Sequence, residues 1–160
     1  HVLELSDFRN GPFNFDVMID RGGYVTIIEI GPRFGGNGIP EIIAHGAGFD
    51  EVEASIVYAL EGKPLDTRAR EHDAIIPTGS RILGCGNAGI LRQMTPRAAV
   101  IQKHAPGLLD LVYDFQVGER VEKFTQGNHR VGQVIATAPD LTLLDQLLDR
   151  ITADINLQVR

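Results

Sequence analysis

The chain is poor in cysteine and lacks tryptophan: Cys85 is its only cysteine. A single thiol excludes an internal disulfide and a thiolate zinc site, and it predicts a reducing cytoplasm. The formal net charge is −6. No basic run is present, which argues against a nucleic-acid or anionic-membrane surface. No apolar run approaches the roughly 20 residues of a membrane span. A signal peptide and a starting methionine are also missing, so we expect a trimmed or fragmentary chain.

What the chain does contain is enough apolar material for a core, since 43% of its 160 residues are hydrophobic. This predicts one domain or one and a half. Residues 13–19 and 24–30 are typical of two strands joined by a turn at 20–23, and residues 39–45 and 50–60 have helical spacing. A polar stretch at 66–73 marks a boundary. We therefore expect domains at 1–66 and 67–160.

The second half predicts short strands and one long helix. Strands are expected at 74–77, 80–83 and 131–137, and a hairpin at 108–115 and 120–124 around Gly118 and Glu119. Residues 141–155 carry one leucine-rich stripe, with Asp140 as the N-cap. The predicted fold class is α+β, in which antiparallel strands pack against helices in both halves.

The register of the first hairpin brings acidic side chains to one face. An even-length turn between Arg21 and Gly22 would pair Asp16 with Ile27 and Asn14 with Glu29. Asp16 and Glu29 would then be diagonal neighbours, with Cβ atoms roughly 7–8 Å apart. Such a pair can reach one cation between them, although a merely solvated hairpin face is the alternative.

The end of the second strand favours a functional site. Glu29 is followed by a Gly31-Pro32 break, and Arg33 lies within that break, before a glycine pair. A carboxylate can hold a divalent cation, and a guanidinium can hold phosphate oxygens. Loops at strand ends are where proteins of this class usually keep their chemistry.

These residues carry a family resemblance. The motifs are GPFNFD at 11–16, IEIGPRFGGN at 28–37, IPEII at 39–43 and GFD at 48–50. Residues 11–62 resemble the C-terminal lobe of the ATP-binding domain in the ATP-grasp superfamily, most closely proteins similar to the large subunit of carbamoyl-phosphate synthase. The second half resembles, more loosely, the small α+β subdomain that follows that lobe.

The resemblance implies roles for particular residues. Asp16 and Glu29 would hold Mg²⁺ or Mn²⁺ on the phosphates of ATP, and Arg33 would bind the transferred phosphate or an acyl phosphate. The glycine loop, Gly35, Gly36 and Asn37, would also contact the cofactor. One departure is Gly31, which stands where the superfamily usually has a metal-binding asparagine, so the number of metal ions is open.

The implied activity is that of an ATP-dependent carboxylate–amine or carboxylate–ammonia ligase that forms an acyl phosphate. The other ATP-grasp lobe and the domain before it would be partners outside this chain, the carboxylate and amine would be small molecules, and a homodimer is a further expectation. The isolated chain is expected to be inactive.

Two alternatives belong to other functional classes. Residues 84–89, GCGNAG, match the G-x-G-x-x-G dinucleotide fingerprint, with Asp110 or Asp114 as the ribose-binding acid. Pro96 would interrupt the helix that this motif requires. A non-catalytic module for oligomerisation or small-molecule binding is the second alternative. Cys85 is expected to be buried and inert, and the five histidines show no metal-ligand spacing.

Overall fold

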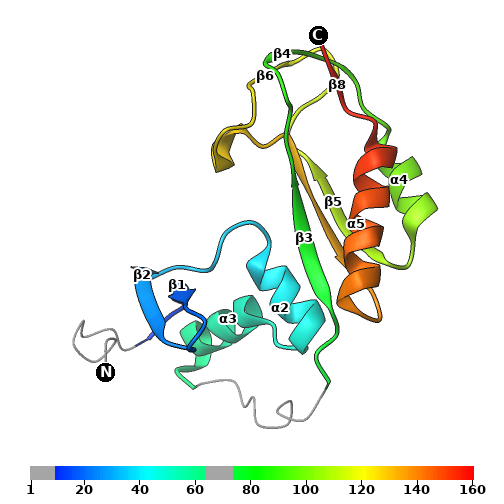
Figure 1. The fold of residues 1–160 in the computed structure, drawn as a ribbon. Helices are drawn as coiled ribbons and strands as arrows, with labels where there is room; N and C mark the ends of the chain where they lie inside the picture. The colour runs from blue at the N-terminus through cyan, green and yellow to red at the C-terminus, as the bar shows by residue number, and fades with distance from the viewer. Residues whose placement is uncertain (1–9, 64–73) are drawn as a thin grey trace.

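A computed structural model describes residues 10–63 and 74–160 of the chain. Its N-terminal half pairs β1 (Asn14–Ile19) with β2 (Val25–Gly31) in an antiparallel hairpin. Helices α2 (Ile39–Ala47) and α3 (Glu51–Glu61) follow, and α3 is the one drawn next to the hairpin in Figure 1. All four elements confirm the predicted ones to within two residues at each end. The predicted boundary at 66–73 lies outside the described residues.

The C-terminal half contains two antiparallel three-stranded sheets. The first has the order β3 (Thr78–Leu83), β7 (Gly132–Thr137), β5 (Leu108–Tyr113). The second, at the end of the molecule that holds the C-terminus, has the order β6 (Arg120–Val121), β4 (Gly89–Gln93), β8 (Gln158–Val159). A short 3-10 turn, η2 (Gly127–His129), precedes β7.

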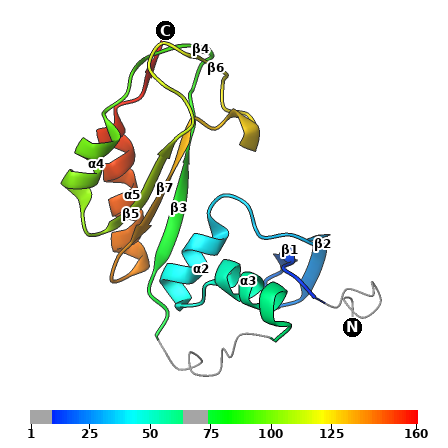
Figure 2. The same ribbon diagram turned by 180° about the vertical axis from the view of Figure 1, so that it is seen from behind.

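Helices cover both faces of the first sheet. Val134 and Ala136 on β7 are fully buried and face α4 (Arg97–His104) and α5 (Leu141–Ile155), which lie together on one side of the sheet in Figure 2. Side chains alternate along a strand, so Gln133 and Ile135 face the other way. That face meets the start of α2, since a Cβ added to Gly38 would lie 2.8 Å from Ile135 Cδ1. The N-terminal half is therefore docked on β7.

The core is concentrated in the C-terminal half. Helix α5 begins at its predicted cap, where the Asp140 carboxylate accepts the backbone N–H of Leu143 at 2.8 Å. Its buried stripe, Leu144, Leu148, Ile151 and Ile155, packs into a cluster drawn entirely from residues 83–155. By contrast, the first hairpin exposes much of its apolar surface, with Met18 at 60% and Ile28 at 64% of full exposure. A two-stranded hairpin of this kind is marginal alone.

Several sequence-based predictions for this half were wrong. Residues 74–77 form no strand. The expected hairpin at 108–124 does not exist, because β5 pairs with β7 and β6 pairs with β4. Helix α4 was not predicted: Pro96 is the residue before its first turn, where a missing N–H costs nothing. Within the described residues, no helix is both long and apolar enough to cross a membrane.

Candidate functional site

The turn of the first hairpin sets the position of its carboxylates. Asp20 pairs with Tyr24 across three turn residues, and its Oδ1 accepts the backbone N–H groups of Gly22 at 2.8 Å and Tyr24 at 2.9 Å. Gly23 has φ 83°, a left-handed conformation that favours glycine. A three-residue loop of this kind differs from the even-length turn that the sequence suggested. Ile19 therefore pairs with Val25 rather than with Tyr24.

A bulge then moves the register once more. Val17 pairs with Ile27, whereas the next residue back, Asp16, pairs with Glu29, so that Ile28 is the extra residue. The predicted pairing of Asp16 with Ile27 was wrong. Asp16 and Glu29 are opposed directly rather than diagonally, which brings their Cβ atoms to roughly 4.5–5.5 Å. The expectation that these two acids share one face of the hairpin is confirmed, and both are exposed.

Asn14 joins this pair of acids. Its Nδ2 donates to Asp16 Oδ1 at 3.0 Å, and its partner across the hairpin is Gly31. The predicted pairing of Asn14 with Glu29 was wrong, and no role was predicted for Asn14. The sequence did contain a sign of this contact, because Asn14 and Asp16 are two residues apart on one strand and so lie on the same face.

Arg33 folds back over the end of β2. A Cβ placed on Gly31 would lie 3.5 Å from both Cγ and Nε of Arg33, so the arginine side chain covers the space that a larger residue at Gly31 would use. Its Nη1 donates to the Phe34 carbonyl at 3.0 Å. Because a Cβ on Gly31 would point to the same side as Glu29, two residues earlier, the guanidinium lies on the carboxylate side of the hairpin.

The glycine loop after Arg33 leads directly into α2. A Cβ on Gly35 would lie 2.8 Å from Ile39, whereas one on Gly36 would meet nothing within 4 Å. Asn37 and Gly38 both have left-handed backbone, with φ 55° and 75°. Gly36 thus has an open backbone surface, which allows close approach of a ligand.

The oxygen donors at this face fit a magnesium ion. Asp16 and Glu29 offer carboxylates from facing positions, and Asn14 Nδ2 donates to the Asp16 carboxylate. In the described part of the chain no third histidine, cysteine or acid joins them. Mg²⁺ usually takes one or two protein carboxylates and completes its shell with waters and substrate phosphates. The facing charges also repel each other unless a cation lies between them.

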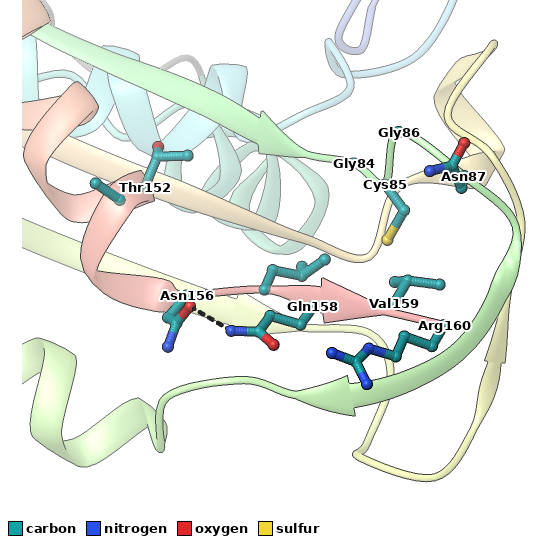
Figure 3. Close-up of a pocket in the computed structure, with 11 residues that line it drawn as sticks. Gly84, Cys85, Gly86, Asn87, Thr152, Asn156, Gln158, Val159 and Arg160 are labelled. Atoms are coloured by element: carbon teal, nitrogen blue, oxygen red, sulfur yellow. Dashed lines mark hydrogen bonds between the residues drawn. The ribbon is translucent and has the colours of Figure 1, made fainter.

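The G-x-G-x-x-G loop does not form a dinucleotide site. Gly89 begins strand β4 rather than a helix. A Cβ on Gly84 would lie 2.4 Å from the ring of Phe124, and one on Gly89 would lie 2.8 Å from the Arg160 carbonyl. These glycines are explained by close packing. The loop borders a cavity of about 650 Å³ whose other wall is the end of α5 and β8 (Figure 3).

Among the described residues, Cys85 and His104 lie in structural surroundings away from the candidate site. Cys85 is only 3% exposed, and burial raises the pKa of its thiol, as expected for an inert cysteine. His104 Nε2 lies 2.7 Å from Asp154 Oδ2, where it ties α4 to α5. This contact stabilises the helix pair and lies in the C-terminal core.

A second cavity, of about 640 Å³, lies between the hairpin entry and α3. Phe13, Phe34 and Tyr58 are among its apolar walls. One oxygen of Glu51, Oε1, is buried at its edge without a hydrogen-bond partner. Burial, helped by the neighbouring Asp50 carboxylate, raises the pKa of Glu51.

Comparison with known proteins identifies a family for the C-terminal half of the chain. Residues 81–160, half of the 160-residue chain, match the family described as L-amino acid ligase C-terminal domain 2. A search of curated proteins gave no match.

Solved structures share the fold over nearly the whole chain. An L-amino acid ligase from Bacillus licheniformis is 16% identical with a TM-score of 0.77, over 99% of this chain and 38% of that one. A phosphoribosylglycinamide synthetase from Anaerococcus prevotii is 20% identical with a TM-score of 0.81, over 99% and 39%. A biotin carboxylase from Campylobacter jejuni is 15% identical with a TM-score of 0.65, over 94% and 32%.

The chain thus spans about two fifths or less of the length of these structures. Their common architecture is that of the ATP-grasp superfamily, and the mixed α+β fold with antiparallel sheets confirms the predicted fold class. The chain belongs to the L-amino acid ligase C-terminal domain 2 family, within the ATP-grasp superfamily.

Proposed function

We propose that this chain supplies the metal- and phosphate-binding hairpin of a longer ATP-dependent ligase that joins a carboxylate to an amine through an acyl phosphate. The observation that carries the proposal is the direct opposition of Asp16 and Glu29, with Arg33 folded over Gly31 on the same side. Asn14 Nδ2 donates to Asp16 Oδ1 and orients that carboxylate. This set of groups suits a nucleoside triphosphate with its bound cation.

The reaction assigned to the site begins with transfer of the γ-phosphoryl group of ATP to a substrate carboxylate oxygen, which leaves ADP. Magnesium, when bound, neutralises charge on the phosphates. Asp16 and Glu29 would hold that ion, and the Arg33 guanidinium would face the oxygens of the moving phosphoryl group. Gly35, Gly36 and Asn37 would lie along the nucleotide. The amine then attacks the acyl carbon, loses a proton and releases inorganic phosphate.

The family match favours an L-amino acid as the carboxylate substrate, since the family takes its description from L-amino acid ligases. The sequence resemblance of residues 11–62 to the large subunit of carbamoyl-phosphate synthase would instead favour bicarbonate and ammonia. We propose the amino acid, because the match covers half of the chain. A reducing cytoplasm stays the expected compartment, from the single cysteine.

The chain alone is expected to bind nucleotide poorly. The exposed apolar surface of β1 and β2 and the 38% coverage of the similar ligase support a second lobe that closes over ATP from outside this chain. Isothermal titration of the 160-residue chain with MgATP measures this directly. We expect weak binding or none, and tight stoichiometric binding would contradict the second lobe.

The test of the function uses the intact protein that contains this chain. It is incubated with MgATP and hydroxylamine, together with each common L-amino acid or with bicarbonate and ammonium. We expect ADP and an amino-acid hydroxamate, because hydroxylamine traps acyl phosphates. Release of AMP would refute the acyl phosphate, a response to bicarbonate alone would favour the other substrate class, and no nucleotide turnover would favour a non-catalytic module.

A further inference from the structure

Gln133 is the one buried polar residue among the described parts of the chain, at 7% exposure in the middle strand β7. Its side chain faces the N-terminal half, away from the apolar core. Its Nε2 donates to the backbone carbonyl of Asn37 at 2.5 Å, across 96 residues of sequence. Asn37 lies four residues after Arg33, in the glycine loop. The contact therefore joins the C-terminal subdomain to the proposed phosphate-binding segment.

The orientation of this amide is fixed by its two partners. Arg130 Nη1 donates to Gln133 Oε1 at 3.0 Å. A guanidinium can only donate and a backbone carbonyl can only accept, so the amide satisfies both in one orientation. Arg130 is held in turn, since its Nε lies 2.9 Å from Asp114 Oδ2. Gln133 is thus braced from the C-terminal side.

The loop is shaped to receive that amide. Asn37 and Gly38 both have left-handed backbone, at φ 55° and 75°. A Cβ on Gly38 would lie only 2.5 Å from Gln133 Nε2. Ser80 Oγ also donates to the Asn37 carbonyl, at a weaker 3.3 Å. Close backbone approach and a buried donor together fix the loop just before α2.

We propose that Gln133 is a positioning residue that holds the Gly35–Gly38 loop, and through it Arg33, against the C-terminal subdomain. The inference rests on the proposed function for its catalytic consequence. Gln133 is hydrogen-bonded to the backbone of the loop, so in the proposed site it would act through the loop and not directly on ATP or the reacting carboxylate. Its role is to keep the guanidinium aligned with the transferring phosphoryl group, where small displacements are costly. In this way the C-terminal subdomain, which contains the family match at residues 81–160, positions the proposed phosphate-binding site in the N-terminal half.

The test compares two substitutions at Gln133 in the intact protein. Gln133→Glu keeps an acceptor for Arg130 but places an oxygen against the Asn37 carbonyl. Gln133→Met removes the donor without a charge, and it serves if the glutamate variant does not fold. Gln158, an exposed glutamine on β8 in the same half, provides the matched controls Gln158→Glu and Gln158→Met.

Two measurements are made on each variant: amide hydrogen exchange over residues 33–42, and kcat and KM for ATP. The amides of Ile39 and Ile42 bond to Gly36 and Gly38 and report opening of the loop. We expect exchange there to accelerate at least about tenfold in the Gln133 variants. We also expect kcat to fall at least about tenfold, with KM for ATP changed less than about threefold. The Gln158 controls should match the unchanged protein in both measurements.

Unchanged exchange would overturn the contact, and faster exchange with an unchanged kcat would overturn the positioning role. If the parent protein itself shows no ATP turnover while the Gln133 variants accelerate exchange, the proposed function fails and the anchoring of the loop is upheld. The two failures are therefore distinguishable.

Discussion

Asp16 lies directly opposite Glu29 in the antiparallel pair β1–β2, on the strand positions next to the bulge. Each carboxylate is exposed, and Asn14 Nδ2 donates to only one of them, Asp16. Like charges at facing positions destabilise a hairpin in the absence of a counterion. The arrangement is costly for stability alone and useful once a cation is bound.

That repulsion can be measured without substrate. In metal-free buffer we expect Asp16→Asn to raise the free energy of unfolding by about 0.2–1 kcal/mol, and less at high salt. Glu29→Gln should give a similar gain, and the double variant should give less than the sum. Urea unfolding of the parent protein, the two single variants and the double variant, with and without Mg²⁺, completes a double-mutant cycle. Additive gains that do not respond to Mg²⁺ would mean that the two charges do not interact.

Substitutions at the charged groups should lower the rate of the intact enzyme. We expect Glu29→Gln and Arg33→Ala each to reduce turnover at least about 10²-fold, on the scale of losing a charge partner of the transition state. Glu53→Gln on α3 and Arg21→Ala in the hairpin turn are matched controls at exposed positions. Turnover close to that of the controls would contradict both assignments.

Glu51 predicts a pH dependence of opposite sign to that of a salt-bridged acid. Burial raises its carboxyl pKa, so the folded state binds this proton more tightly than the unfolded chain does. The contribution of Glu51 to the free energy of unfolding is therefore favourable below the ordinary pKa of a glutamate. This contribution is lost as the pH rises through the raised pKa of the folded state.

Glu51→Gln should therefore stabilise the protein near pH 7, by about 0.5 kcal/mol, and have less effect near pH 4. Glu53→Gln removes a charge from the same first turn of α3 and controls for the helix dipole. Urea unfolding at both pH values measures the difference. Equal effects of the two substitutions at both pH values would show that burial of Glu51 carries no penalty.

Cys85 should react slowly in the folded protein. Burial raises the pKa of its thiol and limits access, so we expect a disulfide reagent to label it at least about 10²-fold more slowly than in urea. A variant with Cys85→Ser and Asn87→Cys moves the thiol to an exposed position of the same loop and should react rapidly. Rapid labelling of native Cys85 would reopen a reactive role for the loop.

Local patterns predicted the hairpin and the longest helix correctly. Helix α5 was predicted over its full length because its cap, Asp140, and its apolar stripe are close together in the sequence. The shared face of Asp16 and Glu29 also followed from strand alternation. The register did not, since two local deviations, a three-residue turn and a bulge, each shift it by one residue.

The other features could not be predicted from local patterns, because they depend on pairing between residues distant in the sequence. Residues 108–113 pair with β7 and residues 120–121 with β4, so the apparent hairpin between them was decided by partners distant in sequence. The contact of Gln133 with Asn37 spans 96 residues. A glutamine between Gly132 and Val134, on an otherwise apolar strand, is the sole local sign of it. Sequence alone could not supply its partner.

The most direct measurement is a crystal structure of the intact protein with Mn²⁺ and a non-hydrolysable ATP analogue. We predict an anomalous peak between Asp16 and Glu29, with oxygens of both carboxylates bound to the ion, and the Arg33 guanidinium on the terminal phosphate. An ion bound to the phosphates with both carboxylates turned away from it would contradict the account.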